Sequence, residues 1–261
     1  MRRGYLDTDH GQLHYYDWRP PEPEAHSGTV WVGLASMPYS GLFFETVAAH
    51  RPAGAQLIGV DLPGYGQSDP LPQAPTIEDY ARSVAALLAE LAVPRIELVG
   101  FHTGCLVALG LAQMLPMRIT RLNLIDAPAF DAATRAKHLE NTPPEREIGS
   151  TLESIEPIFN FNIARHGDRL PVERGLALMV EDLKSGRGQP LGFRAAFGYD
   201  ALAQAAAVTQ PVRLVGTDSP LLDPTRALAA ALPDAQFEHW ADAGSPVFEQ
   251  SAARIASWLF G

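Results

Sequence analysis

Short runs rich in apolar residues recur along the chain, separated by polar stretches that contain glycine and proline. A run of this length is typical of a strand buried on both faces of a parallel sheet. The pattern predicts strands at residues 13–18, 29–34, 56–61, 96–100, 122–125, 212–215 and 237–240.

Residues 77–91 have a different periodicity, with apolar side chains at every third or fourth position on one helical face. Thr76 is a candidate N-cap, two acidic residues follow it, and Pro94 marks the end of the helix. A turn rich in proline and glutamate is expected at residues 20–23. Further helices are expected at residues 41–50, 103–114 and 252–260.

Strands that alternate with helices predict the α/β class, a mostly parallel central sheet flanked by helices. Residues 130–210 break this alternation and predict several helices, most clearly at 150–159 and 170–184. Such an insertion would form a helical cap over the carboxyl ends of the strands, where open α/β sheets bind ligands. We therefore expect a core of residues 1–129 and 211–261 and a cap of residues 130–210.

Charge and length narrow the expected partners. The chain has 261 residues, with 30 acidic and 20 basic side chains and a formal net charge of −10. This balance argues against nucleic acid and membrane partners, because phosphate contacts need clustered lysine and arginine. A small molecule, as substrate or ligand, is the expected partner, and a homodimer is compatible with the sequence.

The single cysteine, Cys105, excludes an internal disulfide and most cysteine-based metal sites, and we expect it to be a core residue. No spacing of His, Asp or Glu indicates a metal site, so neither a metal nor a cofactor is expected. The first residues lack the apolar stretch of a signal peptide, and no apolar run approaches a membrane span. A cytoplasmic protein is therefore expected.

The most informative local pattern is a tight turn between a predicted strand and a predicted helix. Its sequence is Gly-Phe-His-Thr-Gly at residues 100–104. The two glycines allow a strand to bend abruptly into a helix, because side chains at those positions would collide. The residue at the apex, His102, would then stand above the sheet.

Several motifs in the same order resemble the α/β-hydrolase superfamily over nearly the whole chain. The string Asp-Leu-Pro-Gly-Tyr-Gly-Gln-Ser-Asp at residues 61–69 is similar to the loop that follows the fourth strand in that family. The turn at residues 100–104 is similar to its nucleophile elbow. The resemblance implies an α/β-hydrolase fold with a helical cap insertion.

The resemblance fails where the family places its catalytic triad of serine, histidine and acid. His102 stands at the nucleophile position, Ser219 at the acid position with Asp218 one residue earlier, and Ser245 at the histidine position. The oxyanion loop, usually His-Gly-x-Pro, is Ala-Ser-Met-Pro at residues 35–38. We interpret these changes as loss of the ancestral triad on a retained scaffold.

His102 either fills the space of the old nucleophile or acts as a general base, general acid or ligand-binding group. Imidazole titrates near neutral pH, and the adjacent helix N-terminus would favour its neutral form. Asp126 and Asp218 are the candidate carboxylates to orient it, and a turn or capping role is the alternative for each.

Backbone donors survive side-chain changes, so part of an oxyanion hole is expected to persist. The resemblance implies one donor at the Thr103 N–H and a second at Ser36 or Met37. Ser219 and Ser245 are poor candidate nucleophiles, although either could donate a hydrogen bond to His102 or to a ligand.

Three functions are compatible with these residues. The first is a divergent hydrolase-like enzyme that uses His102 for acid–base chemistry on a small, fairly apolar molecule, by hydrolysis, elimination, isomerisation or cyclisation. The second is a non-catalytic small-molecule-binding protein with a degenerate triad. The third is a serine hydrolase with a displaced triad, which would need a serine such as Ser36 and a histidine from the cap.

Overall fold

The computed structural model describes residues 1–20, 28–93 and 95–261. Most of the turn predicted at residues 20–23, and the helix end predicted at Pro94, lie outside the described residues. None of the helices in the described part of the chain is long and apolar enough to cross a membrane.

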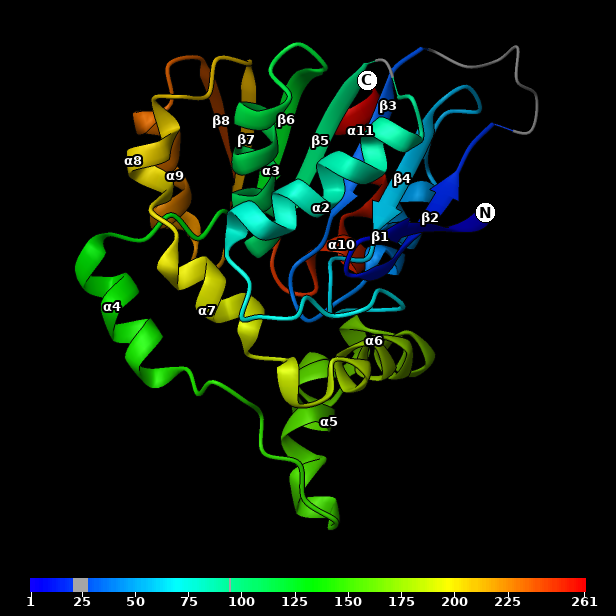
Figure 1. Ribbon diagram of the computed structural model, residues 1–261, viewed down its shortest axis with the longest axis vertical. Helices are drawn as coiled ribbons and strands as arrows, with labels where there is room; N and C mark the ends of the chain where they lie inside the picture. The colour runs from blue at the N-terminus through cyan, green and yellow to red at the C-terminus, as the bar shows by residue number, and fades with distance from the viewer. Residues whose placement is uncertain (21–27, 94) are drawn as a thin grey trace.

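The described strands form a single eight-stranded, mostly parallel sheet with the order β1-β2-β4-β3-β5-β6-β7-β8 (Figure 1). The pairs β1–β2 and β2–β4 are antiparallel, and the other pairs are parallel. All seven predicted strands are present, together with an unpredicted edge strand, β1. The strands are β1 (Arg2–Thr8), β2 (Gly11–Trp18), β3 (Val30–Leu34), β4 (Gln56–Val60), β5 (Ile96–Phe101), β6 (Ile119–Ile125), β7 (Val212–Thr217) and β8 (Ala235–Trp240).

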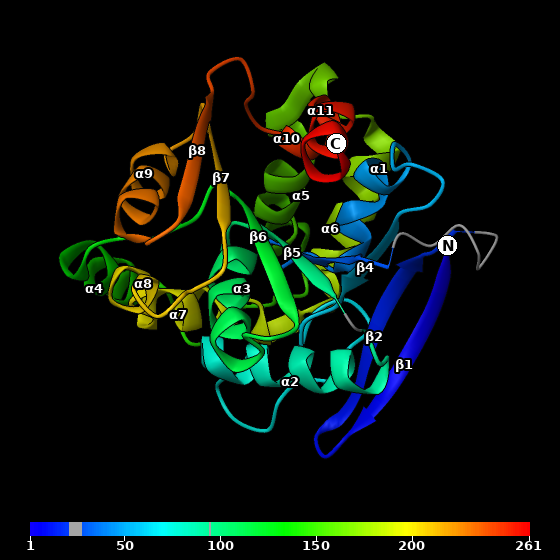
Figure 2. The same cartoon turned by 90° about the horizontal axis from the view of Figure 1, so that it is seen from above.

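Helices cover both faces of the sheet (Figure 2). The buried side chains of α2, α3 and α9 belong to one apolar core, and those of α1, α10 and α11 belong to a second core on the opposite face. These helices are α1 (Glu45–Ala48), α2 (Ile77–Glu90), α3 (Thr103–Met114), α9 (Leu222–Ala231), α10 (Val247–Gln250) and α11 (Ala252–Phe260).

The buried strand β3 shows how the sequence specifies both cores. Successive side chains of a strand point to opposite faces of a sheet. Val30, Val32 and Leu34 therefore enter the core of α2 and α3, while Trp31 enters the core of α11 and contacts the Phe260 ring at a centroid distance of 4.8 Å.

The start of α2 agrees with the prediction. The Thr76 hydroxyl accepts a hydrogen bond from the Asp79 N–H at 3.2 Å, and the Asp79 carboxylate accepts one from the Thr76 N–H at 2.8 Å. This reciprocal capping box satisfies two N–H groups that a helix start otherwise leaves unpaired. The helix ends at Glu90, with Leu91 as its C-cap.

Residues 130–210 lie between β6 and β7 and form a helical insertion without a strand. Figure 1 shows α5, α6 and α7 below the sheet and α4 projecting to one side. The helix predicted at 150–159 is instead a short 3-10 turn followed by α5. The elements are α4 (Ala132–Asn141), η3 (Leu152–Ser154), α5 (Glu156–Asn162), η4 (Ala164–Arg169), α6 (Val172–Lys184), η5 (Gly186–Gly188), α7 (Leu191–Gly198) and α8 (Ala201–Ala205).

Candidate functional site

The turn between β5 and α3 holds His102 in a strained backbone conformation, with φ 47° and ψ −117°. The His102 N–H donates to the Ile125 carbonyl at 3.1 Å, and its own carbonyl accepts from the Cys105 N–H at 2.9 Å. A Cβ atom on Gly104 would collide with the Leu34 carbonyl oxygen. The sharp turn inferred from the glycine spacing is therefore present, and His102 stands at its apex.

Aromatic rings form one wall beside His102. The imidazole packs against Phe101 at a centroid distance of 3.9 Å. Phe101 stacks on Phe43 at 5.2 Å and contacts Phe248 at 4.8 Å, and Phe43 in turn stacks on Tyr39 at 5.3 Å. This wall of four rings is an apolar surface next to a half-buried imidazole.

The protonation state of His102 differs from the sequence-based expectation. Burial, together with the positive charge of Arg165, lowers the pKa of His102 to about 4. The expectation that it titrates near neutral pH is wrong, because a desolvated imidazole beside a cation resists protonation. At neutral pH the ring is an uncharged proton acceptor, so it cannot serve as a general acid in the free protein.

Asp126 is fully buried and binds Thr217 rather than His102. Its carboxylate accepts the Thr217 N–H at 2.8 Å and the Thr217 hydroxyl at 2.6 Å. Burial raises the pKa of Asp126. Asp218 is exposed, and its N–H donates to the Ala243 carbonyl at 2.8 Å. Among the described residues, no carboxylate forms a hydrogen bond or ion pair with the His102 ring.

The two serines at the old triad positions are also apart from His102 in their contacts. The Ser219 hydroxyl accepts the Leu221 N–H at 3.2 Å and lowers the pKa of Asp126 by hydrogen bonding, while Ser245 is exposed. Cys105 is buried as expected, and burial raises the pKa of its thiol.

The structure does bring together the residues of the predicted oxyanion site. Ser36, Met37 and Thr103 are all buried, and the Met37 N–H donates to the Thr103 hydroxyl at 2.8 Å. The Ser36 hydroxyl donates to the Met37 carbonyl at 3.2 Å. A Cβ on Gly192 of α7 would collide with the Met37 side chain, so α7 packs directly on this loop. One of the two expected backbone donors is therefore occupied by a neighbouring side chain.

A buried polar chain joins the insertion to the edge of the sheet. The Tyr39 hydroxyl donates to Asn162 Oδ1 at 2.9 Å, and Asn162 Nδ2 donates to Asp182 Oδ2 at 3.0 Å. Arg146 donates to the other oxygen of Asp182 at 2.6 Å. Sequence analysis missed these residues, because no motif or periodicity links a tyrosine after β3 to an asparagine at the end of α5.

Arg165, in η4, was also missed. Its guanidinium lies 3.8 Å from the Phe161 ring centroid, and its Nε donates to His166 Nε2 at 3.1 Å. The pKa shift of His102 shows that the charge of Arg165 acts on the apex of the turn. The charge pattern of the insertion gives no sequence signal for this, since other arginines lie nearby in the chain.

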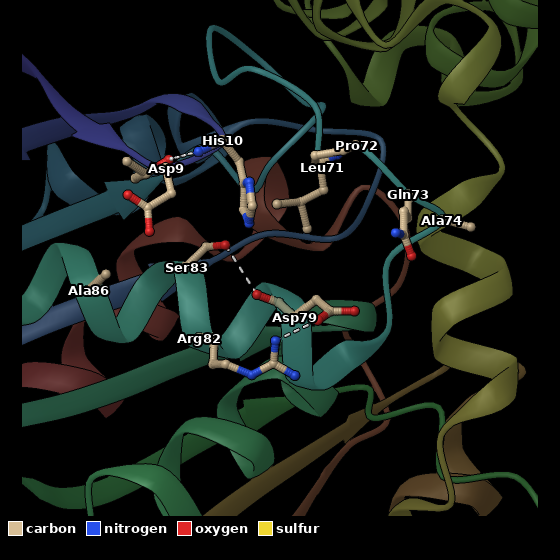
Figure 3. Close-up of a pocket in the computed structure, with 11 residues that line it drawn as sticks. Asp9, His10, Leu71, Pro72, Gln73, Ala74, Asp79, Arg82, Ser83 and Ala86 are labelled. Atoms are coloured by element: carbon tan, nitrogen blue, oxygen red, sulfur yellow. Dashed lines mark hydrogen bonds and ion pairs between the residues drawn. The ribbon is translucent and has the colours of Figure 1, made fainter.

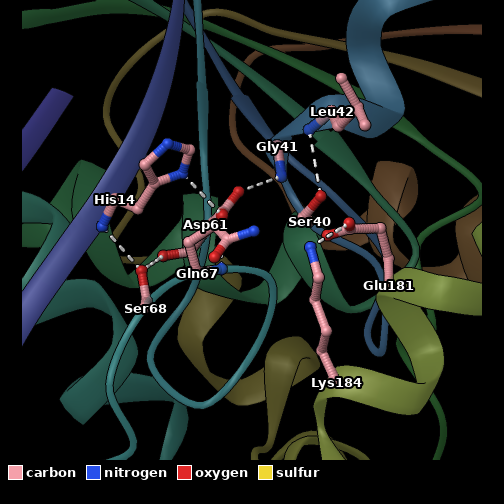
Figure 4. A network of polar contacts seen from close by, with 9 residues as sticks. All are labelled: His14, Ser40, Gly41, Leu42, Asp61, Gln67, Ser68, Glu181 and Lys184. Atoms are coloured by element: carbon pink, nitrogen blue, oxygen red, sulfur yellow. Dashed lines mark hydrogen bonds and ion pairs between the residues drawn. The ribbon is translucent and has the colours of Figure 1, made fainter. Parts of the chain in front are cut away.

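The loop at residues 61–69 has a structural role (Figure 4). Asp61 Oδ2 forms a 2.8 Å contact with His14 Nδ1, and its Oδ1 accepts the Gly41 N–H at 2.7 Å. Ser68 accepts the His14 N–H at 2.8 Å and donates to the Asp61 carbonyl at 2.7 Å. The motif therefore ties β2 and the end of β4 to the loop that leads towards Tyr39.

Two surface cavities lie elsewhere. One, of about 400 Å³, lies between the β1–β2 turn, the loop at residues 71–74 and α2 (Figure 3), and its Asp79–Arg82 pair is joined at 2.6 Å. The other, of about 420 Å³, lies between the start of α2 and α7. His102 lines neither. Among the described residues, no cluster of three or more His, Cys, Asp or Glu could hold a metal ion.

The sheet order, the sharp turn after β5 and the helical insertion after β6 define the α/β-hydrolase class of proteins. A family model described as the alpha/beta hydrolase fold matches residues 32–149. Pimeloyl-[acyl-carrier protein] methyl ester esterase of Aromatoleum aromaticum is 30% identical over 223 residues, which cover 78% of this chain and 86% of that protein. This chain therefore belongs to the α/β-hydrolase family.

Other similarities are partial or concern the fold alone. The dihydrolipoyllysine-residue acetyltransferase component of the acetoin cleaving system of Pseudomonas putida is 31% identical over 88 residues, 34% of this chain, and the match spans about a quarter (24%) of that protein's length. A solved hydrolase structure from Pseudomonas aeruginosa matches with a TM-score of 0.77 at 20% identity, covering 100% of this chain and 99% of the other.

Proposed function

We propose that this protein is a small-molecule enzyme of the α/β-hydrolase family in which neutral His102 acts as a general base in place of a serine nucleophile. The half-buried imidazole at the apex of the turn, in the strained backbone position that the family gives its nucleophile, carries this proposal. The similarity to an esterase supports chemistry on a carbonyl compound.

The proposed first step is removal of a proton from the substrate, or from a water molecule that attacks it, by the neutral ring of His102. A base with a pKa of about 4 is weak in the free protein, because catalysis is most efficient when the pKa lies near the working pH. Bound substrate must therefore favour the protonated ring. The wall of four aromatic rings would accept an apolar part of that substrate.

The contact between Met37 and Thr103 bears on the reaction type. A serine-type mechanism needs free backbone donors at the developing oxyanion. The Met37 N–H already donates to the Thr103 hydroxyl, which leaves the Thr103 N–H as the other expected donor. This arrangement favours a reaction that starts with proton removal over one that starts with attack by an enzyme nucleophile.

The test is turnover of a panel of esters, thioesters, lactones and epoxides by the wild type, His102→Ala and His239→Ala. His239 is an exposed histidine on β8, so its replacement is a matched control. General base catalysis contributes roughly 10²–10⁴-fold, and we expect a loss in that range for His102→Ala alone. Equal turnover by His102→Ala and the wild type, with both folded by circular dichroism, would refute the general-base role.

A non-catalytic binding protein is the second candidate. The occupied Met37 N–H favours it, as does the lack of a carboxylate contact to His102 among the described residues. It predicts saturable binding of a small molecule that is recovered unchanged after long incubation. Appearance of product that depends on His102 would exclude this candidate.

A further inference from the structure

The charged side chains that act on Tyr39 separate into two ion pairs and one remaining cation. Asp182 is paired with Arg146 at 2.6 Å, and Glu249 with Arg174 at 3.0 Å. Arg165 is the remaining cation. It forms no ion pair with a carboxylate anywhere in residues 1–20, 28–93 or 95–261.

Local contacts hold Arg165 in place without neutralising it. The Phe161 ring lies under its guanidinium, and His166 accepts its Nε–H. Both contacts leave the terminal amino groups available for an anion, and burial lowers the pKa of Arg165 without abolishing its charge at neutral pH. A partly desolvated cation of this kind attracts an anion more strongly than an exposed one does.

Arg165 lies over the same wall of rings that borders His102. The Tyr39–Asn162 hydrogen bond fixes the end of α5 against Tyr39, and η4 with Arg165 begins two residues later. From Tyr39 the stacked rings of Phe43 and Phe101 lead to His102. The positive field of Arg165 at His102 is consistent with this placement.

We infer that Arg165 is a substrate-binding residue and that the ligand carries a carboxylate, held between the guanidinium and the His102 ring. The inference rests on the proposed function, whose substrate class it names. A guanidinium matches a carboxylate with two parallel hydrogen bonds. A single unpaired arginine balances a monoanion, which favours a carboxylate over a phosphate dianion.

The bound carboxylate also solves the weakness of the base. Its negative charge offsets the field of Arg165 and stabilises the imidazolium, so the pKa of His102 rises in the complex. The substrate thereby converts a weak acceptor into a competent one. A neutral analogue that fills the same space does not have this effect.

The test uses four probes of one shape: benzoate, benzamide, benzylamine and phenyl phosphate. Their affinities are measured by NMR titration of the wild type, Arg165→Met and Arg169→Met, where Arg169 is the matched control from the same short helix. We expect the wild type and Arg169→Met to bind benzoate roughly tenfold more tightly than benzamide, in line with a charge-assisted hydrogen bond. Arg165→Met should lose that preference, and Arg165→Lys should keep part of it.

The second readout is the pKa of the His102 ring, measured by NMR with and without benzoate. It should rise on benzoate binding in the wild type and stay unchanged in Arg165→Met. Equal affinity for benzoate and benzamide, or a preference that survives Arg165→Met, overturns the inference, and tighter binding of phenyl phosphate overturns the carboxylate assignment. Loss of the His102 turnover effect with an intact benzoate preference would refute the general base but support the anion site.

An independent observation concerns α6, which exposes apolar side chains and buries acidic ones. Val172, Leu176, Val180 and Leu183 are 57%, 47%, 50% and 36% exposed and recur at helical spacing, as one stripe. Glu181 and Asp182 lie on the buried side. We call these four apolar residues the α6 stripe.

The geometry points to a second copy of this chain as the partner of the α6 stripe. The stripe is nearly symmetric about Leu178, so antiparallel pairing across a twofold axis places Val172 against Leu183 and Leu176 against Val180 of the other copy. Glu173 lies at one end and Arg187 at the other, and both are exposed without an ion pair among the described residues. Pairing across the axis brings these opposite charges together.

Sedimentation equilibrium over a series of protein concentrations tests this pairing. The wild type and the control Leu152→Glu, which changes an exposed residue outside the stripe, should dimerise, and Val180→Glu should be monomeric. Glu173→Arg should weaken the dimer, and adding Arg187→Glu should restore it. A monomeric wild type, a dimer that Val180→Glu leaves intact, or binding of the stripe to lipid vesicles instead would overturn it.

Discussion

At His102 the backbone adopts a conformation that glycine tolerates and other residues adopt only at a cost. The positive φ is imposed by the turn, because the strand before it and the helix after it pack closely through Gly100 and Gly104. A side chain held in such a conformation costs of order 1–3 kcal/mol. The fold therefore stores strain at the residue to which we assign the chemistry.

Two variants that both remove the imidazole separate this strain from the side chain. His102→Gly should be more stable than His102→Ala by about 1 kcal/mol, because only glycine relieves the positive φ. Urea unfolding of both variants measures the difference in free energy of unfolding. Equal stability, or a more stable alanine variant, would show that the turn is relaxed.

The lowered pKa of His102 predicts a pH dependence of stability. Its pKa falls from the ordinary 6.5 to about 4 on folding, so between these values the unfolded chain binds more protons than the folded one. The stabilisation is complete above about pH 6.5 and is lost as the pH falls through this window. Compared with His102→Gln, the wild type should lose more free energy of unfolding between pH 6.5 and 4, and parallel curves would contradict the assigned pKa.

At the scale of elements, the carboxyl ends of β6 and β7 are held together by Asp126 and Thr217. Both groups are buried, and two hydrogen bonds join them. Residues 91 positions apart thus close one edge of the sheet next to the turn that carries His102. This explains why Asp126, which the sequence offered as a partner for His102, has a contact that serves the sheet.

Asp126→Ala tests that assignment. Removing the carboxylate leaves the Thr217 N–H and hydroxyl unpaired in the interior, at about 1–3 kcal/mol for each such group. We expect a fall in the free energy of unfolding in this range, and a change within about 0.5 kcal/mol for the exposed Asp218→Ala. A strongly reduced kcat in folded Asp126→Ala, with stability unchanged, would instead favour a catalytic role.

At the scale of the whole molecule, the helical insertion is attached to the sheet edge by a few buried polar contacts. Tyr39, Asn162, Asp182 and Arg146 form one chain, and the Tyr65 hydroxyl accepts the Gly192 N–H at 2.9 Å in another. These contacts fix the part of the insertion that carries Arg165 over His102. Loosening them should affect the insertion more than the sheet.

Asn162→Ala should therefore increase amide hydrogen exchange in residues 156–184 while leaving exchange in β3, β5 and β6 unchanged. The buried Tyr39 hydroxyl and Asp182 oxygen lose a partner, which favours local opening. Thr151→Ala, an exposed change in the same insertion, is the control. Uniform loss of protection across the sheet would mean that the insertion and the core unfold as one unit.

The sequence by itself determined the features that depend on short-range sterics and periodicity. Apolar runs specify strands, the spacing in residues 77–91 specifies α2, Thr76 specifies its start, and the glycines at 100 and 104 specify the turn at His102. β1 was missed because an edge strand with mostly exposed side chains has little apolar signal. The replaced triad positions were also readable, because they follow from order along the chain.

The tertiary structure alone decided the surroundings of His102. Arg165 lowers its pKa from 63 positions away in the chain, Thr103 reaches the N–H of Met37 across 66 positions, and Asp126 turns to Thr217. None of these contacts leaves a local pattern, because chain closure brings the groups together only when the sheet and the insertion are assembled. A pKa depends on burial and on neighbouring charge, and both are properties of the packed molecule.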